Sequence, residues 1–180
     1  MNKTVIIQAS SKSVGSTNKV VNYLNNNESF DFIDLRTKKI GVFEYDFSNS
    51  DDDFIPLIEE IVSKYDTLIF ATPVYWYSMS ATLKIFFDRL SDLLHYKKDL
   101  GRQLRGKNMA MISNSGDNDL RDGFEMPFIE SAKYLGMNYL GSTHAWFTKD
   151  GNNIHPEAKV KINEFRNILA TKNFKDVLTR

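Results

Sequence analysis

Short apolar runs rich in β-branched residues alternate along this chain with stretches whose apolar residues recur every three or four positions. The recurring sets predict helices, one of which carries Leu83, Phe86, Phe87, Leu90 and Leu94. The short runs predict strands at 4–9, 30–35, 67–72, 108–112 and within 138–147. This alternation predicts an α/β fold: a doubly wound, five-stranded parallel sheet in the order 2-1-3-4-5, with helices on both faces in three layers.

The first predicted strand ends in a loop rich in hydroxyl groups, which leads directly into a helical stripe. Free N–H groups at a helix start favour anions, and the hydroxyls of Ser10, Ser16 and Thr17 add donors. Lys12 supplies positive charge, and Gly15 lets the backbone approach a ligand. The loop therefore predicts a phosphate site, although it has neither the Walker A nor the G-x-G-x-x-G pattern. A plain polar turn with a Ser or Thr helix cap is the alternative interpretation.

The third predicted strand, 67–72, is closed by Pro73, which lacks the N–H group that a central strand needs. Three consecutive aromatic residues follow shortly after, Tyr75, Trp76 and Tyr77. In parallel α/β sheets the loop at a strand's carboxyl end is where ligands bind, so this loop predicts a site for a flat, conjugated ligand. Closure of the core or contact with a partner subunit is the alternative role for these rings.

The helix after this loop begins with Ser78 or Ser80 as its cap. On that helix Lys84 and Asp88 are spaced to form a surface ion pair. Residues 97–107, rich in Lys and Arg, are expected to form a loop.

The fourth predicted strand ends at Ile112, and a second polar, glycine-containing loop follows it. Side chains and N–H groups of this loop are candidates for hydrogen bonds to the polar edge of a ligand. The candidates are Ser113, Asn114, Ser115 and Gly116.

Residues 36–53 form a long polar loop, and loops of this length in a compact domain are often functional. Its last three residues, Asp51, Asp52 and Asp53, precede a predicted helix that has Pro56 in its first turn. Acidic residues are favoured at a helix N-terminus, so we prefer a capping role for them over a metal site.

The three histidines, His95, His144 and His155, are scattered along the chain. Each is expected to be a surface or second-layer residue. His144 is the best candidate for an exception, because it lies near a predicted strand end on the ligand side.

The composition excludes several function classes. Its 23 basic and 23 acidic residues balance, which gives no support for a nucleic-acid-binding surface. The chain has no cysteine, so disulfides, thiol catalysis and cysteine-ligated zinc or iron–sulfur clusters are ruled out. The sequence shows no signal peptide and no run of about 18 apolar residues. We therefore expect a single domain, residues 1–180, that is cytoplasmic and has no membrane span.

Three motifs together resemble the flavodoxin-like NAD(P)H-dependent FMN reductases and quinone reductases. They are residues 10–17, residues 72–80 with the following 83–90, and residues 113–116. The resemblance implies bound FMN, with its phosphate on Ser10, Lys12, Ser16 and Thr17 and its ring against Pro73, Val74, Tyr75, Trp76, Tyr77 and Ser78. The chain departs from the family pattern at Ala9, where glycine is common, and at Lys12, where arginine is common.

The resemblance also implies a function. Such an enzyme takes hydride from NADH or NADPH and passes two electrons to a small-molecule acceptor, a quinone, a flavin or a similar small aromatic compound. A homodimer is expected, because family active sites often lie at subunit interfaces. The alternative is a flavodoxin-type one-electron carrier, although flavodoxins are typically acidic and this chain is neutral. A phosphoacceptor receiver domain is rejected, since the first strand is followed by Ser10, Ser11 and Lys12 where acids would be needed.

Overall fold

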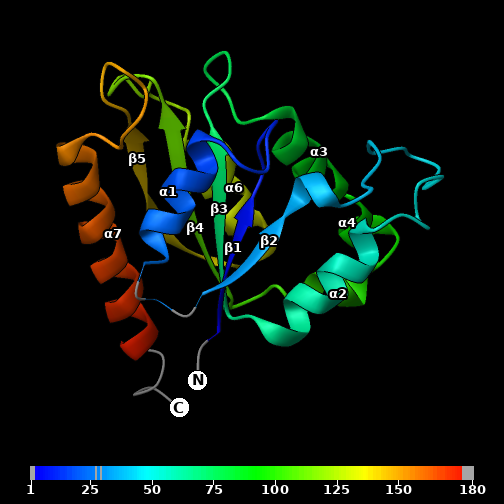
Figure 1. The fold of residues 1–180 in the computed structure, drawn as a ribbon. Coiled ribbons are helices and arrows are strands. Elements are labelled where there is room, and N and C mark those ends of the chain that lie inside the picture. The colour runs from blue at the N-terminus through cyan, green and yellow to red at the C-terminus, as the bar shows by residue number, and fades with distance from the viewer. Residues whose placement is uncertain (1–2, 27, 29, 176–180) are drawn as a thin grey trace.

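The computed structural model of this chain describes residues 3–26, 28 and 30–175. Within these residues five strands form one parallel sheet in the order β2-β1-β3-β4-β5, which confirms the predicted fold class (Figure 1). The strands are β1 (Thr4–Gln8), β2 (Asp31–Asp34), β3 (Thr67–Pro73), β4 (Asn108–Ser115) and β5 (Asn138–Trp146).

Helices cover both faces of the sheet. They are α1 (Ser16–Leu24), η1 (Leu35–Thr37, a 3₁₀ turn), α2 (Phe54–Lys64), α3 (Ala81–Arg89), α4 (Asp92–His95), α5 (Lys98–Arg102), α6 (Met126–Leu135) and α7 (Pro156–Lys175). The structure corrects the predicted loop at 97–107, because α5 lies inside it. No residue of α5 is buried, so the sequence carries no apolar stripe that would have revealed this short helix.

The alternation of side chains along the strands divides the core into two clusters. Val5 and Ile7 point to one face, where they meet α2, α3 and α6, and Ile6 points to the other face, where α1 and α7 pack. Every residue of β1 and β3 is buried, as expected for central strands that helices cover on both sides. The sheet therefore supplies a rigid base, and the loops at its edge carry the polar residues.

The fourth strand is longer than predicted. The sequence suggested an end at Ile112, but β4 continues through Ser115, where it pairs with Trp146 of β5. One of the polar side chains that suggested a loop is instead bonded within the sheet: Ser113 is buried and hydrogen-bonds His144 of the neighbouring strand. Ser113, Asn114 and Ser115 are therefore held by the strand ladder and not by a free loop.

The carboxyl ends of the strands lie together at the top of Figure 1, with the N-terminus of α1 beside them. The loops after β1, β3, β4 and β5 meet there, as the parallel topology requires. Among the helices of the described residues, none combines the length and the apolar character needed to cross a bilayer.

Candidate functional site

A hollow of about 390 Å³ opens at this edge of the sheet, within the size range of small-molecule sites. It lies between the loops that follow β1, β3, β4 and β5. Its lining residues are Ser10, Ser11, Lys12, Gly15, Ser16, Thr17, Pro73, Val74, Tyr75, Asn114, Ser115, Gly116, Phe147 and Gly151. Three segments that are far apart in the sequence, and that were each singled out as ligand loops, therefore share one hollow.

Not every predicted site residue lines this hollow. Trp76, Tyr77 and Ser78 belong to a turn beyond its rim, and Ser113 lies beneath it in the sheet. The remaining predicted residues are all part of the wall. Ser11, Phe147 and Gly151 also line it, and none of the three was predicted as a site residue. Phe147 and Gly151 follow β5, whose carboxyl end lies at the same edge of the sheet as those of the other strands. The parallel topology was therefore a signal that could have identified these two residues.

The loop after β1 presents donors toward the hollow. Gly15 is the N-cap of α1 and no side chain caps this helix, so its first N–H groups are available to a ligand. The side chain of Gln8, which is fully buried, donates to the carbonyl of Ser13 at 3.0 Å and accepts from Asn18 at 3.3 Å. The loop shape is thus fixed from below, on the side away from the hollow.

The loop after β3 is held at both ends and ends in a tight turn. Val74 N–H donates to the carbonyl of Asn114 at 2.8 Å, and Tyr75 and Ser78 exchange two backbone hydrogen bonds. Between them Trp76 and Tyr77 have φ of 47° and 63°, the left-handed region at both central positions of a hairpin turn. Asn and Gly favour such positions, so two bulky aromatic residues there are strained.

Ser80 anchors the far end of this loop, and it confirms one of the two predicted caps. Its hydroxyl accepts from Leu83 N–H at 3.2 Å, as the N-cap of α3, and donates to the carbonyl of Ala9 at 2.8 Å. Its N–H group donates to the Thr72 hydroxyl at 3.0 Å. One buried serine therefore joins the loop after β3 to the end of β1. The predicted Lys84–Asp88 pair is also present on α3.

The loops after β1 and β3 also meet at the rim. The hydroxyl groups of Ser11 and Tyr75 lie 2.7 Å apart and form a hydrogen bond. Tyr75 is 43% exposed, so its ring forms part of the wall and part of the entrance.

Asn114 supplies the clearest sign of an absent partner. Among the described residues its Oδ1 is the buried side-chain nitrogen or oxygen atom that has no hydrogen-bond partner, and the residue lines the hollow. A buried acceptor without a donor costs free energy, about 1–3 kcal/mol. A ligand that brings an N–H group to this wall would remove that cost.

His144, the histidine singled out from the sequence, lies outside the hollow. Its Nε2 donates to the carbonyl of Asp117 at 3.1 Å, so Nδ1 accepts from the Ser113 hydroxyl at 2.8 Å. Burial lowers the pKa of His144, with the nearby charge of Lys161 adding to the effect against the opposing hydrogen bond to Asp117. The lowered pKa favours the neutral ring, which supports the strand and loop that carry Asn114.

Of the three aspartates before α2, Asp52 ties the long loop to α3. Asp52 accepts from Phe54 N–H at 2.8 Å, which agrees with the predicted helix-start role. It also accepts from Gly41 N–H at 2.7 Å and forms an ion pair with Arg89, a contact that the sequence did not reveal. Burial would raise the pKa of Asp52, but the hydrogen bonds from Arg89 and from both backbone N–H groups outweigh it and lower the pKa. In the part of the chain that the structure describes, no group of three or more acidic or histidine side chains is placed to hold a metal ion.

The family model described as NADPH-dependent FMN reductase matches residues 2–151. The chain belongs to this family. The resemblance drawn from the three motifs is confirmed, because the family is one of NADPH-dependent FMN reductases, as those motifs implied.

Individual relatives agree with this placement. YwqN of Bacillus subtilis (strain 168), assigned provisionally as an NAD(P)H-dependent FMN-containing oxidoreductase, is 38% identical over 96 residues, which are 50% of this chain and 51% of the relative. The match thus spans about half of the relative's length.

Solved structures confirm the fold. That of the Trp repressor binding protein from Bacillus subtilis is similar with a TM-score of 0.68 at 25% identity, covering 93% of this chain and 97% of that one. An FMN-dependent NADH-azoreductase from Bacillus anthracis, in complex with FMN, has a TM-score of 0.60 at 16% identity and covers 94% and 100% of the two chains. At that identity the likeness shows the fold alone.

The residues of the hollow fit the cofactor of the family. A phosphate suits the free N–H groups of α1, the hydroxyls of Ser10, Ser16 and Thr17 and the charge of Lys12. At the other wall, the unpartnered Oδ1 of Asn114 suits the N–H group that the pyrimidine end of a flavin carries. FMN has a phosphate at one end and a flavin N–H group at the other, and the anion site and the buried acceptor of this hollow match these two ends.

Proposed function

We propose that this protein binds one FMN per chain in the hollow, oxidises NADH or NADPH, and passes two electrons to a quinone, a flavin or a similar small aromatic acceptor. The observation that carries the proposal is the pairing of the anion site at the start of α1 with the unpartnered Asn114 Oδ1 in the same hollow. Bound FMN supplies the redox chemistry, because its ring accepts hydride from a nicotinamide and then reduces an acceptor.

The protein's own residues would bind and orient the FMN. Ser10, Lys12, Ser16 and Thr17 would hold the phosphate. Pro73, Val74 and Tyr75 would position the ring system, and the turn beyond them, with Trp76 and Tyr77, would border its exposed side. Asn114, Ser115 and Gly116 would hold the polar edge. Each element rests on the sheet or is tied to it, so the site is preorganised.

The experiment that tests cofactor binding is direct. The purified protein is incubated with excess FMN and desalted, and its absorption spectrum is recorded. We expect flavin absorbance at one FMN per chain. An Asn114→Ala variant should retain less FMN, because it loses the acceptor at the polar edge, while Lys64→Ala, a change far from the hollow on α2, serves as the matched control. A colourless wild-type protein would refute the proposal.

The second half of the test separates an enzyme from a one-electron carrier. NADH or NADPH is mixed anaerobically with the FMN-loaded protein in a stopped-flow instrument, and a quinone is added afterwards. We expect the nucleotide to bleach the flavin absorbance directly and the quinone to restore it. If neither nucleotide bleaches it while a chemical reductant does, the carrier function replaces the proposed one.

A homodimer is part of the same proposal. The turn after β3 exposes 93% of Trp76 and 67% of Tyr77, and a second copy that covers these rings would remove apolar surface from water. Light scattering should give twice the mass of one chain, and replacing Trp76 with serine should shift the equilibrium toward the monomer. A wild-type mass of one chain would refute this part. The cytoplasmic location expected from the sequence stays a prediction.

A further inference from the structure

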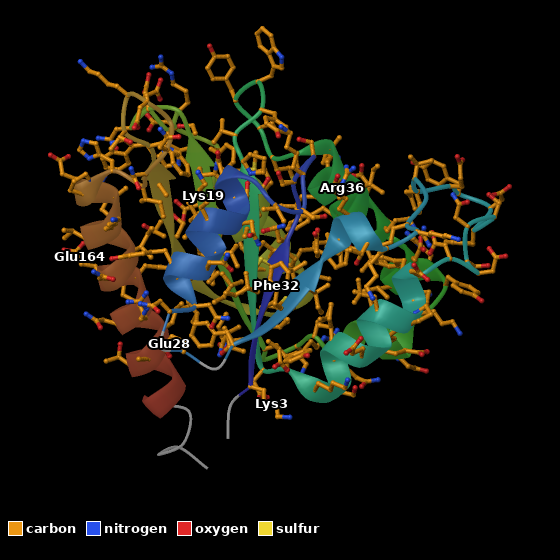
Figure 2. All side chains as sticks on the ribbon, in the orientation of Figure 1. Lys3, Lys19, Glu28, Phe32, Arg36 and Glu164 are labelled. Carbon is orange, nitrogen blue, oxygen red and sulfur yellow. The ribbon has the colours of Figure 1, made fainter. Side chains whose placement is uncertain are left out.

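His144 on β5 is a buried residue next to the proposed FMN site, and the proposed function does not use it. The residue is 7% exposed and lies outside the hollow. Its ring contacts the end of β4 and the loop that follows β4. In Figure 2 the side chains of the segments after β4 and β5 gather beside the start of α7, at the upper left. The ring is therefore in a position to act on the wall of the hollow that Asn114 belongs to.

Both ring nitrogens of His144 are occupied by hydrogen bonds. Nδ1 accepts from the Ser113 hydroxyl at 2.8 Å, and Nε2 lies 3.1 Å from both the Ser115 hydroxyl and the carbonyl of Asp117. The Ser115 hydroxyl donates to the same carbonyl at 2.6 Å, so its oxygen can accept from Nε2–H. This set of bonds is complete only for the neutral ring with its proton on Nε2, because that form can accept at Nδ1.

Asn114 lies between these two serines in the chain, and its carbonyl ties it to the loop after β3. That carbonyl accepts from Val74 N–H at 2.8 Å, while the buried Oδ1 in the wall of the hollow has no partner among the described residues. Neither serine can shift without moving the backbone of the residue between them. The position of the acceptor that we assign to the flavin therefore depends on the hydrogen bonds that His144 makes.

Protonation of His144 would break this arrangement. With a proton on each nitrogen the ring can only donate, so the Ser113 hydroxyl loses its acceptor. In the described part of the chain that hydroxyl bonds His144 alone, and Ser113 is 1% exposed, so water cannot replace the lost partner. A buried donor without an acceptor is costly, and Ser113 has to turn or shift to relieve it. Asn114, the next residue, would then move from the position that suits the flavin.

The groups around the ring determine which form is present. Burial is the main cause that lowers the pKa of His144, and the positive charge of Lys161 on α7 adds to it. Asp117, on the loop after β4, opposes both through its carbonyl and its charge. His155, also on α7, stacks on Trp146 as His144 does, with ring centres 5.4 and 6.4 Å from that of the tryptophan. The lowered pKa favours the neutral ring, the form that holds both serines, in neutral solution.

We infer that His144 is a positioning residue of the FMN site, whose neutral ring holds the serines on either side of Asn114 and whose protonation weakens FMN binding; this rests on the proposed function. The protein would thus lose cofactor affinity in acidic solution through a residue that does not touch the cofactor. Coupling of this kind is reciprocal: if the neutral form binds FMN more tightly, bound FMN must lower the pKa of His144 further. Affinity is then full above the pKa of the FMN-free protein and falls as pH drops below it.

The first experiment follows the ring itself and needs no turnover. The pKa of His144 is measured by NMR with and without FMN, and its signals are assigned by elimination with His95→Asn and His155→Asn. We expect FMN to lower this pKa by about one unit, which corresponds to a tenfold change in affinity. Ser113→Ala is the comparison variant, because it removes the hydroxyl that the protonated ring leaves without an acceptor.

In Ser113→Ala the lowering by FMN should disappear. The charge of the FMN phosphate acts on the ring in both proteins, so the difference between them isolates the contribution of the hydroxyl. An FMN-induced change in the pKa of His144 that is equal in the two proteins overturns the inference.

The second experiment measures the Kd of FMN by fluorescence titration at about pH 8 and about pH 5, on either side of the ordinary pKa of histidine. The FMN phosphate itself titrates near pH 6, so each variant is compared with wild type at both values. Wild-type protein should lose about tenfold more affinity on acidification than His144→Gln, which cannot titrate. The matched control is His155→Asn, which removes a histidine from the same stack on Trp146 and should behave like wild type.

The outcomes separate this inference from the proposed function. Equal loss of affinity in wild type and His144→Gln would overturn the inference while FMN binding itself stands. The same holds if His155→Asn removes the extra loss as fully as His144→Gln does. If His144→Gln does not fold, the comparison of wild type with Ser113→Ala decides the question in both experiments. A wild-type protein that binds no FMN at pH 8 would refute the proposed function, and this inference with it.

Discussion

Arg89 on α3 is the buried cation that ties the long loop before α2 to the rest of the molecule, and its replacement gives a sharp test of stability. The side chain is 1% exposed. Its five N–H groups all donate: Nε to Asp92 at 2.8 Å, and the two terminal nitrogens to Asp52 and to the carbonyls of Gly41 and Asn49, both at 3.1 Å. The guanidinium also lies 4.9 Å from the ring centre of Phe54.

Replacing Arg89 with alanine would leave two carboxylates without their cation. Asp92 is 3% exposed and cannot regain water, while Asp52 is 14% exposed and can do so in part. Removing one partner of a buried ion pair costs about 3–5 kcal/mol, so we expect Arg89→Ala to lower the free energy of unfolding by about that amount. Arg89→Lys should recover part of the loss, because ammonium keeps the charge but has three donors in place of five.

Urea unfolding of the FMN-free protein at pH 7, followed by circular dichroism, measures this loss. The matched control lies on the same helix: Lys84→Ala breaks the exposed Lys84–Asp88 pair, whose side chains are 59% and 46% exposed, and should cost about 0–1 kcal/mol. Hydrogen exchange should also quicken across residues 41–52 in Arg89→Ala and not in the control. Equal destabilisation by the two variants would refute the reasoning.

The pH dependence gives a second, independent check of the same contact. The pKa of Asp52 is lowered in the folded protein, so its contribution to stability is present above the unfolded value and is lost as pH falls through the folded one. The stability difference between wild type and Asp52→Asn should therefore stay constant above about pH 5 and shrink in more acidic solution. A difference that grows as pH falls would contradict the assigned direction.

Three further predictions concern the site and its supports. Replacing both Ser16 and Thr17 with alanine should weaken FMN binding by about 1.5–3 kcal/mol for each lost charge-assisted hydrogen bond but barely affect riboflavin, which has no phosphate; equal weakening, measured by fluorescence titration, would mean that both residues only serve the helix. Replacing Trp76 and Tyr77 with Asn-Gly should raise the free energy of unfolding of the FMN-free protein by about 1–3 kcal/mol, because the turn's left-handed strain is removed, and no gain in urea unfolding would contradict the strain. Because burial lowers the pKa of His144, wild-type stability should fall as pH drops below about 6.5, and His144→Gln should flatten that slope in pH-dependent unfolding.

The fold followed from the sequence because its signals are local and repeated. The apolar runs and helical stripes needed no long-range information, and the parallel topology then placed the loops after β1, β3 and β4 at one edge. Because these loops share one edge, Ser10, Pro73 and Asn114, each from a different segment, lie in one hollow.

What the sequence could not show depends on contacts between distant segments. Polar residues at 113–115 suggested a loop, and only their partners on β5 explain why the strand continues. The pairing of Asp52 with Arg89 joins residues 37 positions apart, and no spacing rule predicts it. The same holds for the bond from Arg36 to Ser11, which is visible only once β1 and β2 lie side by side.

The strained turn at Trp76 and Tyr77 can persist because the segments around it are fixed. On one side Val74 is hydrogen-bonded to Asn114, and on the other Ser80 is bound to Ala9, Thr72 and Leu83. With both ends held to the sheet, the five residues between them have little freedom to relax, and the rings of Trp76 and Tyr77 stay outside the hollow. This strain at the rim of a ligand site lowers the stability of the fold. Under the proposed function it has a use, because the strained turn holds the two rings beside a cofactor face that must remain open to nicotinamide and acceptor in turn.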